Sequence, residues 1–393
     1  MQAYCARWKS DIQMVVGITC YPVYGGSGVV ATELGLALAA RGHEVHFISY
    51  ALPFRLEHIK ENVFFHEVTV NGYPLFEYPP YTLNLASKMV DVALSAKLDL
   101  LHVHYAIPHT TSALFARQIL LEKGINLPVV TTLHGTDITI VGRDPSFKHV
   151  VNHSINHANG VTSVSDYLRR ETLLDSEITK EIEVIPNFID TERFRPMDKR
   201  HFKAALCPEG QPLLIHVSNF RPVKRAPDVI RIFKELLDRS IEAKLLMVGD
   251  GPDRAVAERL ARDLGVYEDI RFLGKQDPIE EILSLADVFI MPSESETFGL
   301  AALEAMACGV PTIVNQVGGL PELVTHGKDG FLCGSGTIGE YVDYAYQILT
   351  KPELAASLSE AGRKRAKDFE LSAIIPQYES FYARTIEQTM LPD

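Results

Sequence analysis

Two glutamates flank the start of a predicted helix in residues 292–311, PSESETFGLAALEAMACGVP. Residues 287–291, DVFIM, predict a buried strand before them, and the helix is predicted to begin near residue 298 or 299 and to end at Gly309. Glu296 lies just outside that start and Glu304 two turns inside. Eight residues at about 100° each rotate the second carboxylate by about 80° from the first, so both are predicted to face one cleft.

The chemistry at such a helix start depends on charge. The unpaired N–H groups there suit a diphosphate, whereas an ionised glutamate accepts two donors from a vicinal diol. Acidic residues near a helix start also complement the helix dipole without any ligand, and for each glutamate alone that alternative stays open.

Three cations follow the predicted strand 213–217, in SNFRPVKR: Arg221, Lys224 and Arg225. The whole chain has a net charge of −12, so a local basic cluster is informative and predicts an anionic ligand. Solvated surface charge is the alternative interpretation.

A second glycine-rich loop, CYPVYGGSG, joins the predicted strand 14–19 to a helix expected from about residue 29 to residue 40. Gly25, Gly26 and Gly28 let a backbone approach phosphate closely, although a tight turn alone would explain them. The loop is not GxGxxG, and the strand 44–49 ends without a carboxylate to bind a ribose, so a dinucleotide dehydrogenase is not predicted.

His134, in TTLHGTD, follows another predicted strand and is a candidate for sugar contact, although histidines at strand ends are often structural. His102, His104 and His109 have metal-ligand chemistry, but no carboxylate or cysteine accompanies them, and no metal site is predicted.

Composition excludes several classes of protein. The chain has 393 residues, 46% hydrophobic and 22% charged, and its acidic balance argues against binding nucleic acid or an anionic membrane. No apolar run is long enough to span a membrane. Its five scattered cysteines suggest reduced thiols and a cytoplasmic location. Residues 1–13 are expected to be a disordered extension or to follow a start codon placed too early.

Strand and helix patterns alternate twice along the chain, which predicts an α/β protein with two Rossmann-like, doubly wound domains facing a cleft. The pattern breaks at 186–196, where we expect a linker and domain closure about it. The predicted domains are residues 14–190 and 191–373. A last helix, 374–390, is expected to pack back on the first domain.

Residues 296–311 contain a glutamate, seven residues that include Phe-Gly-Leu, a second glutamate and then AMACGVP. This string resembles the signature of family 4 of the retaining glycosyltransferases, which have the GT-B fold. The resemblance implies that Glu296 holds a hydroxyl of the donor sugar and Glu304 the ribose, and that His134 contacts the sugar. It also implies that Lys224 and Arg221 neutralise the diphosphate, although ungapped alignment places Asn219 at the family's arginine position. The donor-binding residues that it implies are completed by Gly25, Gly26, Phe298, Gly299 and Leu300.

In the first domain, GHEVHFIS, HVHYAIPH and TTLHGTDIT resemble segments of family members that transfer N-acetylglucosamine from UDP-N-acetylglucosamine to the hydroxyl of L-malate, the first step of bacillithiol biosynthesis. This resemblance implies that residues 14–190 bind the acceptor and residues 191–373 the nucleotide sugar. The resemblance implies retention of the anomeric configuration, no metal and no other cofactor. Because no carboxylate of the first-domain loops is clearly placed as a nucleophile, Asp137 being the only near one, we expect front-face substitution with no covalent intermediate. Cations and hydroxyls for the malate dianion are available at Ser27, Arg55, Tyr105 and Thr132. Open alternatives are another small or lipid acceptor, a nucleotide-sugar epimerase, or a binding module; a homodimer is one option for assembly.

Overall fold

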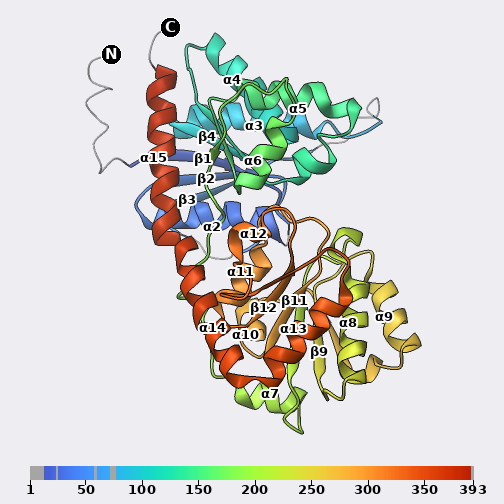
Figure 1. Cartoon of the computed structure of the whole chain (residues 1–393). Helices are drawn as coiled ribbons and strands as arrows, with labels where there is room; N and C mark the ends of the chain where they lie inside the picture. The colour runs from blue at the N-terminus through green and yellow to red at the C-terminus, as the bar shows by residue number, and fades with distance from the viewer. Residues whose placement is uncertain (1–12, 24, 57–59, 71–76, 391–393) are drawn as a thin grey trace. The chain divides into compact units, whose positions relative to one another are not determined.

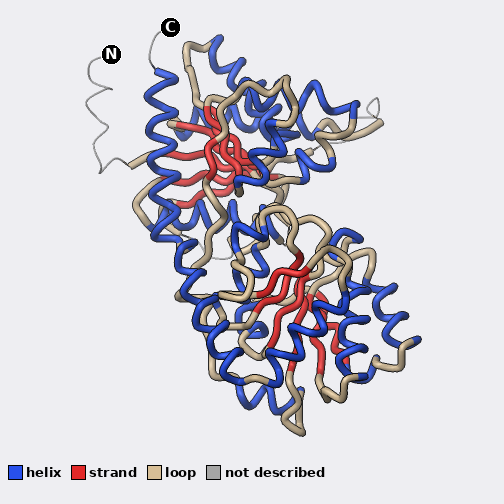
Figure 2. The backbone as a smooth tube through the Cα atoms, viewed as in Figure 1, coloured by secondary structure: helices blue, strands red, loops and turns tan. Residues whose placement is uncertain are grey.

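The computed structural model describes residues 13–23, 25–56, 60–70 and 77–390 (Figure 1). These residues form two compact units. The first extends to Pro186 and takes back the chain from Ser372, and the second runs from Asn187 to Leu371. Strands lie at the centre of each unit with helices around them (Figure 2). No helix in the described ranges is both long and apolar enough to cross a membrane.

The first unit is built on a seven-stranded parallel sheet in the order β3-β2-β1-β4-β5-β6-β7. Its central strands are buried on both faces and therefore consist almost entirely of apolar and β-branched residues. The strands are β1 (Val15–Thr19), β2 (Glu44–Ser49), β3 (Val63–Glu67), β4 (Leu100–His104), β5 (Val129–Leu133), β6 (Gly160–Ser163) and β7 (Glu183–Val184).

Helices follow β1, β3, β4, β5 and β6, whereas β2 and β3 are joined without a helix in the described residues. The helices are α2 (Gly26–Ala40), α3 (Tyr81–Ala96), α4 (Thr111–Glu122), α5 (Pro145–His157), α6 (Asp166–Leu173) and the last helix α15 (Leu371–Met390), with single π-helical turns η1 (Ala106–Thr110) and η2 (Thr136–Ile140). Both segments lie close after strand ends, and η1 is not a regular turn, because Ile107 within it has extended backbone angles.

The second unit has a six-stranded parallel sheet in the order β10-β9-β8-β11-β12-β13. Its strands are β8 (Leu213–Val217), β9 (Lys244–Val248), β10 (Ile270–Gly274), β11 (Val288–Met291), β12 (Thr312–Asn315) and β13 (Phe331–Cys333). The helices are α7 (Arg200–Leu206), α8 (Ala226–Asp238), α9 (Arg254–Asp263), α10 (Ile279–Leu283), α11 (Leu300–Ala307), α12 (Leu320–Leu323), α13 (Ile338–Thr350) and α14 (Pro352–Ala366), with the short turns η3 (Pro222–Lys224), η4 (Tyr267–Asp269) and η5 (Lys367–Phe369).

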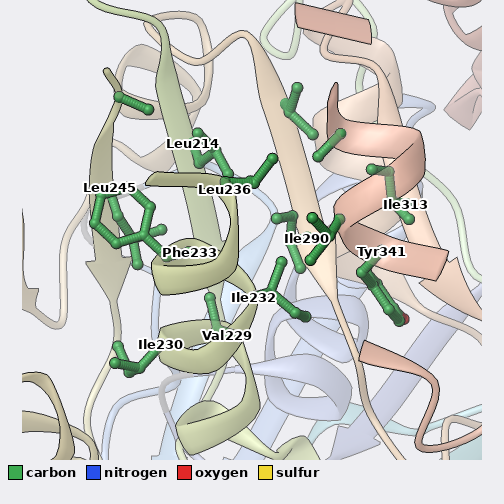
Figure 3. Packing of buried hydrophobic residues seen from close by; sticks show 14 of the residues in the cluster. Leu214, Val229, Ile230, Ile232, Phe233, Leu236, Leu245, Ile290, Ile313 and Tyr341 are labelled. Carbon is green, nitrogen blue, oxygen red and sulfur yellow. The ribbon is translucent and has the colours of Figure 1, made fainter. Parts of the chain in front are cut away.

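The core of the second unit forms where α8 and α13 pack on the sheet (Figure 3). Phe233 of α8 lies against strand residues such as Leu245, and Tyr341 of α13 lies near Ile313. Tyr341 is fully buried, and its hydroxyl donates to the Met291 carbonyl and to Asn315 Oδ1. These contacts satisfy the hydroxyl of the otherwise apolar Tyr341 side chain, and they fix the end of β11, where the candidate site begins.

The last helix packs against the first unit through polar contacts as well as buried aromatic residues. Tyr382 shares a 2.7 Å hydrogen bond with His102 Nδ1, and Glu379 pairs with Arg41 at 2.6 Å. The chain enters and leaves the second unit through neighbouring segments, because Ile189 N donates to Phe369 O and Leu371 N donates to Ile189 O.

The strands and helices predicted from sequence are confirmed, with shifts at their ends. The clearest error is α2, which begins at Gly26 and not near residue 29. A side chain on Gly28 would lie 2.6 Å from the Tyr21 carbonyl oxygen, so only glycine lets the first turn pack on the preceding loop. Strands β12 and β13 and helices α7, α12, α13 and α14 were not predicted individually. The expectation for residues 1–13 lies outside the described part of the chain, except at Gln13.

Candidate active site

The loop after β8 carries the predicted cations, and its backbone is fixed before it reaches them. Phe220 adopts a left-handed conformation, with φ of 40°, and its ring is fully buried. Arg225 is also left-handed, with φ of 52°, and directly precedes α8. Such conformations cost about 1–2 kcal/mol for residues other than glycine and persist only where the surrounding structure holds them. Lys224 therefore projects from a defined turn.

Three contacts join this loop to the loop after β11. Lys224 Nζ lies 2.5 Å from Glu296 Oε1, and both side chains are largely buried. Arg225 Nη1 lies 2.5 Å from Glu294 Oε1, and Glu294 N donates to the Val223 carbonyl at 2.8 Å. The structure thus brings together Lys224 and Glu296, which are predicted to act on adjoining parts of one nucleotide sugar.

Glu296 is oriented by its own backbone. Gly319 N donates to the Glu296 carbonyl at 2.9 Å, and an added Cβ on Gly318 would lie 1.8 Å from the same oxygen. Two glycines after β12 therefore hold the Glu296 peptide by close backbone contact. Because α11 begins only at Leu300, the expectation that helical rotation relates the two glutamates is wrong: Glu296 lies in a loop, and Glu304 is little more than one turn into the helix.

The start of α11 is the second part of this site. Gly299 is left-handed, with φ of 98°, and an added Cβ would meet Leu320 at 2.4 Å. Its carbonyl accepts from Ala302 N and Leu303 N, which closes the first turn. Phe298 is buried against Phe369, with ring centroids 5.5 Å apart. Leu300 is the first helical residue, and Glu304 is buried within the same helix.

His216 in β8 was missed by the sequence reasoning. Its Nδ1–H donates to the Ile290 carbonyl at 2.8 Å, which leaves Nε2 to accept from the Ser218 hydroxyl at 2.8 Å. Ser218 Oγ in turn accepts from Phe220 N at 3.2 Å. Burial lowers the His216 pKa to about 4, so the ring stays neutral and keeps this arrangement at neutral pH. A histidine within the otherwise apolar strand LLIHV is the sequence feature that could have indicated a role for His216.

The turn after β9 shapes the same loop from the other side. An added Cβ on Gly249 would lie 1.8 Å from Ser218 O, and one on Gly251 would lie 2.0 Å from Asn219 O. The two glycines thus permit contact between the loop after β8 and the loop after β9. Asn219 and Arg221 are both exposed, so either one can meet a diphosphate.

In the first unit, His134 is the first residue after β5. Its Nε2 lies 2.7 Å from His104 Nδ1, and the ring of Tyr105 lies 5.3 Å away. Burial, then the neighbouring His109, lowers the His134 pKa to about 3, so the imidazole is neutral. Asp137 lies in the same turn and accepts from Ala106 N and Gly135 N, each at 2.9 Å. Burial raises the pKa of this carboxyl group despite those bonds.

The four predicted acceptor residues occupy different environments. Ser27 Oγ lies 2.6 Å from Tyr105 Oη, so these two are together near His134. Arg55 pairs with Glu33 at 3.1 Å and is largely buried. Thr132 is fully buried, and its hydroxyl lies 2.7 Å from both His102 Nε2 and Thr162 Oγ1, so it belongs to an internal hydrogen-bond network.

Gly25 and Gly26 precede and open α2. Both have positive φ, 133° and 38°, and an added Cβ at either would meet open space. Their backbone is therefore accessible at the start of a fifteen-residue helix. In the part of the chain that the structure describes, no group of three histidine, cysteine or acidic side chains is placed to hold a metal ion.

Comparison with known proteins places this arrangement in a family. The family model described as Glycosyltransferase Family 4 matches residues 24–193, and the model described as Glycosyl transferases group 1 matches residues 197–365. The chain is 46% identical, over 94% of its length and 97% of the relative's, to the N-acetyl-alpha-D-glucosaminyl L-malate synthase of Bacillus anthracis.

Solved structures show the same fold. A glycosyltransferase from Rickettsia africae has a TM-score of 0.79 at 21% identity, covering 95% of this chain and 99% of its own. Anabaena Alr3699/HepE in complex with UDP-glucose has a TM-score of 0.78 at 20% identity, covering 96% of this chain and all of its own. The chain therefore belongs to glycosyltransferase family 4 and has the GT-B fold.

Proposed function

We propose that this glycosyltransferase moves N-acetylglucosamine from UDP-N-acetylglucosamine to the hydroxyl of L-malate, the first step of bacillithiol biosynthesis. The observation that carries the choice of substrates is the 46% identity, over nearly the full length of both chains, to a protein named for that product. The contact between Lys224 and Glu296 supports the donor half of the proposal, because one cation and one carboxylate meet there as a diphosphate sugar requires.

The second unit binds the donor. Lys224, an exposed cation at Arg221 and the backbone N–H groups at the start of α11 meet the diphosphate. Glu296 accepts from hydroxyls of the donor sugar, and Glu304 accepts from the ribose. In the ligand-free protein, Lys224 and Glu296 neutralise each other. When a diphosphate arrives, Lys224 gains a second anionic partner and Glu296 becomes available to the sugar.

The reaction retains anomeric configuration by front-face substitution. The bond from the anomeric carbon to the departing phosphate oxygen breaks, the malate oxygen bonds on the same face, and its proton passes to the phosphate. A double displacement would need a carboxylate nucleophile in the first unit. Asp137 is the nearest candidate there, but it is buried and accepts from two backbone N–H groups, which supports the route without a covalent intermediate.

The first unit supplies the acceptor groups and His134. Ser27 and Tyr105, joined by a hydrogen bond beside His134, are the hydroxyls best placed to orient malate, and Arg55 provides a cation. The proposed reaction needs no metal, because Lys224 and the helix start supply the charge that a divalent ion supplies elsewhere. We propose a cytoplasmic location, supported by the free thiols of the four described cysteines.

The test is to incubate pure protein with UDP-N-acetylglucosamine, with and without L-malate, and to measure UDP and the sugar product. Malate-dependent UDP release with formation of the α-glycoside supports the proposal. Conversion of the donor without malate would indicate an epimerase. Donor binding with no turnover would indicate a binding module, and turnover only with another acceptor would indicate a different family 4 activity.

A further inference from the structure

His104 is hydrogen-bonded to His134 through one of its two ring nitrogens. It is the last residue of β4, fully buried, and its Nδ1 lies 2.7 Å from His134 Nε2. The planes of the two rings are inclined by 26° and their centroids lie 5.0 Å apart, so the rings meet edge to edge through this bond. The other ring nitrogen of His104, Nε2, is buried and has no hydrogen-bond partner among the described residues.

Both rings are neutral, which limits where their protons lie. Burial lowers the pKa of His104 well below 6.5 and that of His134 to about 3. A neutral imidazole carries one N–H, and a hydrogen bond between two rings needs one N–H and one bare nitrogen. Only two arrangements satisfy these conditions, and they differ in which histidine donates.

In the first arrangement, His104 Nδ1–H donates to His134 Nε2. His104 Nε2 is then a bare nitrogen, and His134 carries its own proton on Nδ1. In the second arrangement, His134 Nε2–H donates to His104. His104 then carries its proton on Nε2, where it is buried without an acceptor. Orphaned buried N–H groups are rarer in proteins than unsatisfied buried acceptors, so the first arrangement is favoured.

We propose that His104 is a positioning residue that donates from Nδ1 to His134 and so fixes His134 as the tautomer with its proton on Nδ1. His134 then carries an N–H, not a bare nitrogen, at the ring nitrogen that does not contact His104. The functional consequence rests on the proposed function, in which His134 contacts the donor sugar. A fixed N–H suits a sugar or carboxylate oxygen and makes His134 unsuitable as a base at that atom.

The backbone around His104 restrains it further. His109 Nδ1–H donates to the His104 carbonyl at 2.5 Å, and the ring of His102 lies 4.5 Å from that of His104. Since His104 is in a central strand, it has little freedom to turn and exchange the roles of its nitrogens.

The tautomer is tested directly by nitrogen NMR of the ligand-free full-length protein, labelled with ¹⁵N only in histidine, because protonated and bare imidazole nitrogens differ widely in chemical shift. His134→Asn assigns the resonances. We expect a protonated Nδ1 and a bare Nε2 at His134, and a bare Nε2 at His104. A proton on Nε2 of His134, or on both nitrogens, would overturn the proposal. This measurement needs no substrate, so it stands even if malate-dependent turnover is absent.

The positioning role is tested with two substitutions in the UDP-release assay. His104→Asn places an amide nitrogen near the position of the histidine Nδ1 and keeps a donor, whereas His104→Leu keeps bulk without one. We expect His104→Leu to lower kcat about 10- to 100-fold, the range seen when a residue orienting a functional histidine is removed, with little change in KM. His104→Asn should stay within about threefold of the wild type. Equal losses, or no loss in either variant, would refute the role.

Discussion

The substitution Gly318→Ala tests the backbone contact that places Glu296. The new Cβ would lie 1.8 Å from the Glu296 carbonyl oxygen, whereas real Cβ contacts are essentially never under 3.0 Å. The loop after β11 must therefore move by about 1.2 Å relative to the loop after β12. This movement also breaks the 2.9 Å bond from Gly319 N and shifts Glu296 away from Lys224.

The size of the effect follows from this displacement. A misplacement of about 1 Å at a positioning group costs about 10²-fold in rate. We therefore expect Gly318→Ala to lower kcat for malate-dependent UDP release about 100-fold. The left-handed backbone, with φ of 58°, adds about 1–2 kcal/mol of destabilisation, because alanine is strained there. For a unit of this size, that loss lowers the melting temperature by about 2–8 °C.

Gly327→Ala is the matched control. Gly327 has φ of 72° but open space where its Cβ would lie, so the same backbone strain arises without displacement of the site. Both variants should lose similar stability from strain, while only Gly318→Ala should lose turnover. If the two variants keep kcat within about threefold of each other, the argument that Gly318 positions Glu296 fails.

Three other predictions concern charge, acid and metal. Lys224→Met should lower kcat about 10²- to 10³-fold, as for removal of one charge-stabilising donor. Lys234→Met on α8 should leave kcat unchanged, and equal kcat values for the two variants in steady-state kinetics would contradict the role of Lys224. Acid should destabilise the first unit more than the second, because four histidines of the first unit have pKa values below 6.5 in the folded state. The unfolded state therefore binds more protons, and the free energy of unfolding falls as pH drops from about 6.5 toward 4. Each histidine contributes about 1.4 kcal/mol per pH unit below its unfolded pKa, and Asp137, whose pKa burial raises, acts in the opposite direction. Calorimetry at pH 7 and pH 5 that finds a larger fall in melting temperature for the second unit than for the first would disprove this. Turnover should persist in excess EDTA, and loss of activity that added Mg²⁺ restores would refute the metal-free mechanism.

The amino-acid sequence by itself determined the alternation of strands and helices and the positions of the charged residues at strand ends. Parallel strands buried on both faces must be apolar, and their carboxyl ends must share one edge, so Lys224 and Glu296 were predictable neighbours. Their residue types also limited the chemistry, because a cation and a carboxylate there suit a diphosphate sugar.

Tertiary structure alone decided how those side chains are held. The close contacts of Gly318 with Glu296, and of Gly251 with Asn219, join segments far apart in the sequence and leave no local pattern. Local spacing suggested a helical relation between the two glutamates, but α11 begins only at Leu300, so Glu296 is held by its tertiary contacts and not by the helix. The proton positions on His104 and His134 also depend on which nitrogen finds a partner once both rings are buried, and only the folded chain decides that.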